Sequence, residues 1–123
     1  MKIRIKGDTV RLRLTKTEVN EFGTKGFVEE STQFGADSKL VYTLKKSDCD
    51  ELEASFNHNK IEVRVPHNMA SKWVDTEQVG MNNNENDNTL KILIEKDFAC
   101  LTERVGEDES DMFPHPEGET HNC

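Results

Sequence analysis

Apolar and polar residues alternate with a period of two at the start of the chain. The segments KIRIK (2–6) and TVRLRL (9–14) each place apolar side chains on one face and basic side chains on the other. Gly7 and Asp8 between them supply turn chemistry. The pattern predicts a β-hairpin that has one buried face, with Val10, Leu12 and Leu14 inward.

The remaining alternating segments predict six further strands, at 27–32, 39–46, 51–56, 60–65, 78–81 and 89–97. Thr15 and Glu18 have the spacing of a capping box, which predicts a short helix over 16–22 that stops at Gly23. A second helix is expected from Pro66 onward, because proline suits the first turn of a helix.

The two halves of the chain resemble each other at a shift of about 51 residues. Val10, Leu12 and Leu14 then fall on Ile61, Val63 and Val65, Arg13 falls on Arg64, and Phe22 falls on Trp73. This match favours an internal duplication, although the patterning of an α+β protein also makes unrelated halves look alike. Trp73 is expected in the core.

One such unit offers too few strands to cover its own apolar face, so two units are expected to pack together. The predicted fold class is α+β and mainly antiparallel β. Two ββαββ-like repeats, at about 1–47 and 51–97, would form a closed or half-open barrel with two short helices. Residues 98–123 are expected to form an acidic C-terminal tail that is partly docked.

Composition narrows the function classes. The 123 residues suit one domain, and the net charge of −8 argues against general nucleic-acid binding. The charge is uneven, because residues 98–123 hold seven acids and one arginine. No apolar run is long enough to span a membrane, and the N-terminus lacks the apolar run of a signal peptide. Three cysteines without a CxxC pair predict reduced thiols and a cytoplasmic protein.

The candidate site is the basic face of the first hairpin, which Arg64 would join by pseudo-symmetry. Three interpretations stay open: a solvated surface balanced by nearby acids such as Glu29 and Glu30, an anion site for phosphate or carboxylate, and a surface covered by the acidic tail. The candidate anion-binding residues are Lys2, Arg4, Lys6, Arg11, Arg13 and Arg64.

An enzymatic alternative places carboxylates and arginines inside a barrel, where they would bind a divalent ion and a phosphorylated substrate. Its acids would be Glu30, Glu62 and Glu95, beside Arg11, Arg13 and Arg64. The opening strand carries bases where such a tunnel would begin with acids, which disfavours this hypothesis.

Other chemistry is weakly supported by the sequence. Cys49 lies between two aspartates, which would raise the pKa of its thiol, and no catalytic fingerprint is present. His115, His121, Cys100 and Cys123 are competent zinc ligands, but their irregular spacing is not that of a structural site. We therefore expect no metal site, no cofactor and no catalytic residue.

Several phrases together resemble a family of small uncharacterised bacterial proteins: MKIRIKG, RLRLTKTEV, FG, TEQVG, EKDFACL and DESDMFPHP. The family has no assigned activity, so no catalytic residue carries over. The resemblance implies a free-standing bacterial protein whose C-terminal segment belongs to the domain. Here FPHP stands where FPNP is expected, which argues against a metal role for His115.

The sequence thus favours a non-enzymatic cytoplasmic binding module whose basic hairpin face receives an anionic ligand or an acidic protein segment. The alternative is a metal-dependent hydrolase of a phosphorylated substrate. The two differ in where Arg11, Arg13 and Arg64 point: into one concave pocket beside carboxylates for the enzyme, or outward for the module. A dimer formed through an exposed strand edge is compatible with either.

Overall fold

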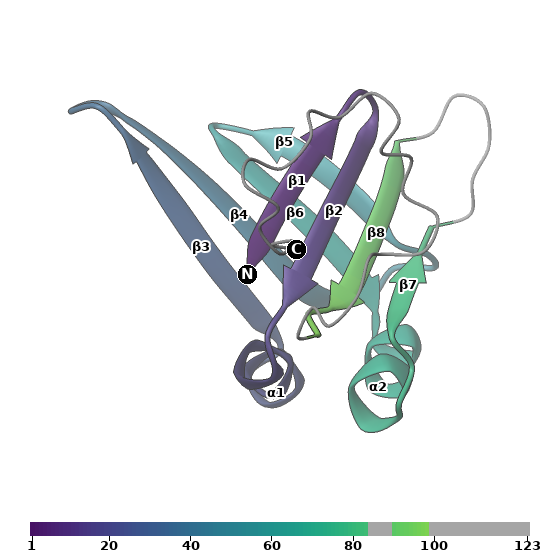
Figure 1. Cartoon of the computed structure of the whole chain (residues 1–123). Helices are drawn as coiled ribbons and strands as arrows, with labels where there is room; N and C mark the ends of the chain where they lie inside the picture. The colour runs from purple at the N-terminus through teal and green to yellow at the C-terminus, as the bar shows by residue number, and fades with distance from the viewer. Residues whose placement is uncertain (84–89, 99–123) are drawn as a thin grey trace, which may run out of the picture.

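The computed structural model describes residues 1–83 and 90–98 of the chain. The order strand-strand-helix-strand-strand occurs twice along these residues, as predicted (Figure 1). In chain order, the elements are β1 (Lys2–Lys6), β2 (Thr9–Leu14), α1 (Lys16–Lys25), β3 (Phe27–Phe34), β4 (Ser38–Ser47), β5 (Glu53–Asn57), β6 (Lys60–Pro66), α2 (His67–Asp75), β7 (Gly80–Asn82) and β8 (Lys91–Lys96).

The strands form two four-stranded sheets. Sheet A has the order β1-β2-β8-β7, and sheet B has the order β3-β4-β6-β5. In each sheet the central pair, β2–β8 or β4–β6, is parallel and the outer pairs are antiparallel. The α+β class is confirmed, but the described strands form no closed barrel, where a closed or half-open barrel was predicted. Each hairpin pairs with a hairpin from the other half of the chain, which gives two separate open sheets.

The two sheets have corresponding registers. In sheet A, Lys2 lies opposite Arg13. In sheet B, Glu53 lies opposite Arg64, and each of these residues stands 51 positions after its counterpart. Equivalent positions on the two sheets can therefore be compared directly.

The helical end of the molecule shows the same correspondence. Lys46 lies over the ring of Phe22 and Lys96 lies over the ring of Trp73, each with its Nζ 5.8 Å from the ring centroid. The two rings contact each other edge to face, with centroids 6.0 Å apart and planes at 70°. The halves thus make equivalent contacts, while the internal duplication itself stays a prediction.

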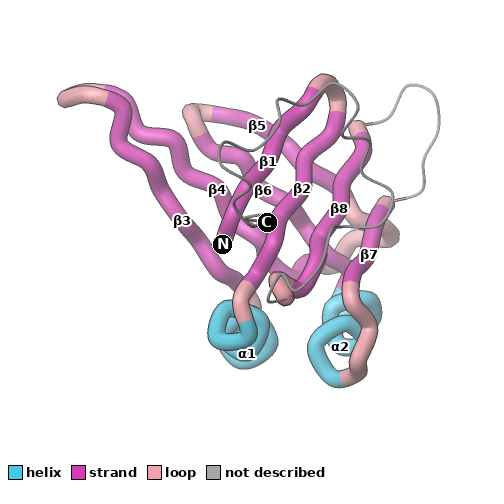
Figure 2. Tube along the Cα trace, viewed as in Figure 1, coloured by secondary structure: helices cyan, strands magenta, loops and turns pink. Residues whose placement is uncertain are grey.

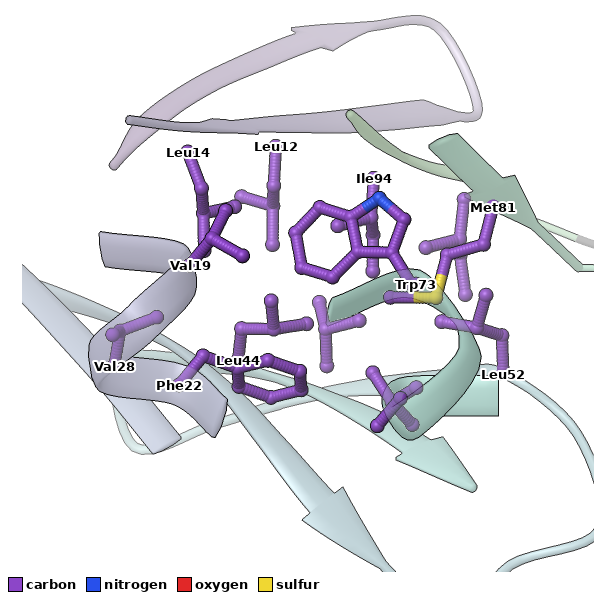
Figure 3. Packing of buried hydrophobic residues seen from close by; sticks show 14 residues of the cluster. Leu12, Leu14, Val19, Phe22, Val28, Leu44, Leu52, Trp73, Met81 and Ile94 are labelled. Atoms are coloured by element: carbon purple, nitrogen blue, oxygen red, sulfur yellow. The ribbon is translucent and has the colours of Figure 1, made fainter. Parts of the chain in front are cut away.

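The core lies between the two sheets and is closed at one end by both helices, which lie side by side at that end (Figure 2). Trp73 is fully buried there, as predicted (Figure 3). Full burial of one such apolar side chain contributes about 1.5–3 kcal/mol, so this shared layer is what holds the sheets together. Its members include Leu12, Leu14 and Ile94 from sheet A, and Leu44, Val63 and Val65 from sheet B.

Helix α1 begins as the sequence predicts and ends later. The Glu18 N–H donates to Thr15 Oγ1 at 3.3 Å, and the Thr15 N–H donates to Glu18 Oε1 at 2.8 Å, which completes the capping box. The predicted stop at Gly23 is wrong, because the C-cap is Gly26 in the left-handed region, with φ of 88°. A Cβ on Gly23 would lie 2.9 Å from Val74 Cγ1, so this glycine permits the close approach of α2.

No described helix covers the end of the sheets away from α1 and α2 (Figure 1). The predicted buried face of the first hairpin is buried at Val10, Leu12 and Leu14, but Ile5 is 56% exposed, and Phe56 in sheet B is 64% exposed. Both line an apolar groove of about 450 Å³ between the sheet ends. The alternating pattern correctly predicts that Ile5 and Phe56 point toward the side of the opposite sheet. It cannot show that the opposite sheet ends before it covers these two side chains.

Candidate anion-binding face

The outward surface of sheet A gathers basic side chains from three neighbouring strands. Strand alternation sends most apolar residues of β1, β2 and β8 toward the core, and it sends the intervening residues outward, among them Leu93 in register with Arg11. We call this surface the basic face, and its bases are Lys2, Arg4, Lys6, Arg11, Arg13 and Lys91. The structure therefore brings together five of the six residues predicted from the sequence, and it adds Lys91.

Like charges lie directly opposite each other on this face. Lys2 is the cross-strand neighbour of Arg13, and Arg4 is the neighbour of Arg11. Directly opposed side chains in a sheet have their Cβ atoms only about 4.5–5.5 Å apart, and like charges there are destabilising. These four bases, with Ile3, line a hollow of about 180 Å³.

Two carboxylates offset part of this charge. Glu95 Oε1 lies 3.1 Å from Arg11 Nε and 4.0 Å from Arg13 Nε, and Asp97 Oδ2 lies 3.2 Å from Lys2 Nζ. The Arg13 side chain points outward but is only 15% exposed, so its neighbours on the face pack around it and restrict its movement. Among the described residues, six bases against two acids leave an excess of positive charge on the face.

The outward surface of sheet B pairs its charges instead. Arg64 Nε donates to Glu53 Oε1 at 2.9 Å, and Lys45 Nζ lies 2.9 Å from Glu62 Oε1. The hydrogen bond from Lys45 lowers the pKa of Glu62, although partial burial opposes this. Sheet B is therefore largely neutralised by its own residues.

Arg64 lies on this second surface and does not join the other predicted residues. The inward neighbours of Arg13 and Arg64 are Leu12, Leu14, Val63 and Val65, which meet in the core, so the two arginines point away from each other. Pseudo-symmetry places Arg64 at the equivalent position of the other sheet, and that position lies on the opposite side of the molecule.

The same geometry separates the residues of the hydrolase hypothesis. Glu95 lies beside Arg11 on sheet A, whereas Glu62 lies beside Arg64 on sheet B. The predicted carboxylates and arginines therefore do not converge in one pocket. Within residues 1–83 and 90–98, no three His, Cys, Asp or Glu side chains are grouped so that they could hold a metal ion.

Cys49 is not activated in this structure. Burial raises the pKa of its thiol, and the nearby carboxylates of Glu53 and Asp50 raise it further, which keeps the reactive thiolate scarce. The direction agrees with the prediction, and burial is the larger cause. Cys100, His115, His121 and Cys123 lie outside the described residues.

Sequence reasoning missed Lys91 and Asp97 as members of this surface. Lys91 lies opposite Thr9, and the Asp97 N–H donates to Leu14 O at 2.8 Å, both through the parallel pairing of β8 with β2. The alternation of KILIEK shows that Lys91 and Glu95 share a face. Only the strand order shows that this face belongs beside the first hairpin.

A model of a family of unknown function, DUF7009, matches residues 1–117. The chain belongs to this family. The match reaches well beyond β8, so the DUF7009 region takes in the acidic stretch 103–111. No curated protein and no solved structure matches the chain.

Neither helix among the described residues is long and apolar enough to cross a membrane. DUF7009 carries no assigned activity.

Proposed function

We propose that this chain is a non-enzymatic binding module, and that its basic face receives a compact anionic group of a ligand or partner. The group would be a phosphate or a carboxylate, because guanidinium forks match both geometries. Arg11 and Arg13 would provide the forks, and Lys2 and Arg4 would provide the flanking charge across the hairpin.

A difference between two equivalent positions carries this proposal. In sheet B the pair Glu53–Arg64 joins opposite charges, whereas in sheet A the equivalent pair Lys2–Arg13 joins like charges. If a face served only to keep the protein hydrated, opposite charges at paired positions, as on sheet B, would make it more stable than like charges. The like-charged arrangement is destabilising, and a bound anion offsets that cost.

The dimensions favour a compact group. Pockets for drug-sized ligands measure about 300–1,000 Å³, and the hollow on the basic face measures about 180 Å³. The net charge of −8 on the chain argues against a long polyanion such as nucleic acid, which would meet repulsion from the rest of the molecule. A short phosphate chain or a small polycarboxylate contacts only the basic face and avoids that repulsion.

Thermal unfolding in the presence of tripolyphosphate or citrate tests the proposal, with sodium chloride at matched ionic strength as the reference. Ligand at ten times its Kd stabilises the native state by about 1.4 kcal/mol, which raises Tm by roughly 5 °C for a domain of this size. The two ligands show whether phosphate or carboxylate is preferred.

Two matched variants locate the effect. In Arg4→Gln/Arg11→Gln the rise in Tm should fall to that of the salt reference, because both substituted residues line the hollow. In Lys45→Gln/Arg64→Gln, with the same change of charge on sheet B, the rise should persist above that variant's own baseline. A rise that persists in the first variant or disappears in the second contradicts the proposal. Stabilisation that requires Mg²⁺ or Mn²⁺ and is followed by phosphate release would indicate the hydrolase instead.

The internal duplication is part of the same proposal, because it explains why the two sheets offer equivalent positions. The matching registers of β1–β2 and β5–β6 support it. An experimental structure in which residues 1–47 and 51–97 do not superimpose would overturn it. A bacterial source and a cytoplasmic location likewise stay predictions, and the cysteine pattern supports the second.

A further inference from the structure

Most of the net negative charge of the chain lies after β8. Residues 99–123 hold seven acids and one arginine, a net of −6, and the whole chain has a net charge of −8. The preceding 98 residues therefore carry only −2. Five of the seven acids fall within a stretch of nine residues: Glu103, Glu107, Asp108, Glu109 and Asp111.

The chain leaves the described fold beside the basic face. Strand β8 lies next to β2 in sheet A, and the residue that follows it, Asp97, already pairs with Lys2 at 3.2 Å. Lys2 is in turn the cross-strand neighbour of Arg13. The first acid after β8 therefore sits at the edge of the hollow that the bases line.

The length of chain suffices for the other acids to reach the same bases. An extended chain spans at most about 3.3–3.6 Å per residue, so the six residues from Asp97 to Glu103 span up to roughly 20 Å. A strand of five residues such as β1 is roughly 17 Å long. Every base of the face is within reach of the stretch 103–111.

The two outer surfaces do not compete equally for this stretch. On sheet B, Arg64 and Lys45 already pair with Glu53 and Glu62 at 2.9 Å. On sheet A, six bases face two acids among residues 1–83 and 90–98. Charge complementarity therefore favours the surface of sheet A, beside which the described chain ends, over that of sheet B.

We propose that the acidic stretch 103–111 of this chain binds its own basic face and competes there with an external anion. This inference rests on the proposed function for the identity of the site. A tethered segment competes at an effective concentration in the millimolar range. The face is then open only to anions that bind better than the tethered acids, which gives the module selectivity without an additional residue in the site.

The test uses the full chain with the five acids replaced by their amides: Glu103→Gln, Glu107→Gln, Asp108→Asn, Glu109→Gln and Asp111→Asn. A control variant has the same change of net charge at five exposed acids of the described fold: Asp37→Asn, Asp48→Asn, Asp50→Asn, Glu51→Gln and Glu77→Gln. The measurements are backbone amide spectra at low salt and the Kd for tripolyphosphate.

The first variant should shift the amide signals of β1 and β2 and bind tripolyphosphate about three- to tenfold more tightly than the unmodified chain, because the tethered competitor is weakened. The control should leave those amides in place and gain less than twofold. Equal gains in both variants, with no shift in β1 and β2, would overturn the inference and leave the proposed function standing. Shifts in β1 and β2 without tripolyphosphate binding in any form would overturn the proposed function and leave the intramolecular contact standing.

Discussion

The contact between Phe22 and Trp73 joins helix α1 of the first half to helix α2 of the second half, and removing it should show how much it stabilises the fold. Trp73 is fully buried, its ring lies edge to face with Phe22, and its Nε1 donates to Val79 O at 3.1 Å. Trp73→Ala removes the ring, the aromatic contact and the hydrogen bond together.

Truncating a buried aromatic residue to alanine costs about 3–5 kcal/mol. Domains of this size unfold with a free energy of about 5–15 kcal/mol, so Trp73→Ala should remove a large share of the stability. Trp73→Phe keeps a ring and removes the indole N–H. It should cost about 0.5–1.5 kcal/mol, the net worth of one hydrogen bond, since Val79 O still accepts from the Lys96 N–H at 2.9 Å. A cycle with Phe22→Leu should give a coupling of about 0.5–1.5 kcal/mol between the rings.

Urea unfolding followed by far-UV circular dichroism is the suitable assay. Trp73 is the only tryptophan, so its fluorescence disappears in the variants. With an m-value of about 2 kcal/mol/M, Trp73→Ala should move the midpoint by about 2 M. A loss below about 1 kcal/mol, or a cycle without coupling, would refute the claim that this contact joins the halves.

Two further predictions concern the helix contact and sheet B. Gly23→Ala should destabilise the protein in the same urea assay, although alanine favours a helix by about 1 kcal/mol, because its Cβ would meet Val74 Cγ1 at 2.9 Å. Adding Val74→Ala should remove that clash, and a Gly23→Ala variant more stable than the parent would contradict the packing. The pKa of Glu62 should rise toward its ordinary value in Lys45→Met, as followed by carbon-13 NMR of the carboxyl group, because the Lys45 hydrogen bond lowers it. Since the folded pKa lies below the unfolded value, this pair stabilises the fold above the unfolded-state pKa, and its contribution is lost as pH falls through the folded pKa. An unchanged pKa would contradict this pairing.

Local patterns in the sequence predicted most of the elements. Period-two alternation located the hairpins, and the Thr15–Glu18 spacing located the start of α1. The end of α1 was placed wrongly at Gly23, because the reason for that glycine is the approach of Val74 from α2. A contact between helices leaves no trace in the local pattern.

Long-range pairing limited the prediction of the site. The first hairpin revealed five of the bases, but the parallel pairing of β2 with β8, which brings in Lys91 and Glu95, joins residues 82 positions apart. Pseudo-symmetry suggested that Arg64 would join them. Equivalent positions of the two halves lie on different sheets, so Arg64, the equivalent of Arg13, lies on the outward surface of sheet B.

The central claim is that anions bind the basic face of sheet A. Titration of the full chain with tripolyphosphate, followed through the arginine Nε–H signals, tests it most directly. The Nε–H signals of Arg11 and Arg13 should shift and saturate together, while that of Arg64, paired with Glu53, stays in place. Saturable shifts at Arg64, or no shift beyond a salt-matched reference at Arg11 and Arg13, would contradict the account.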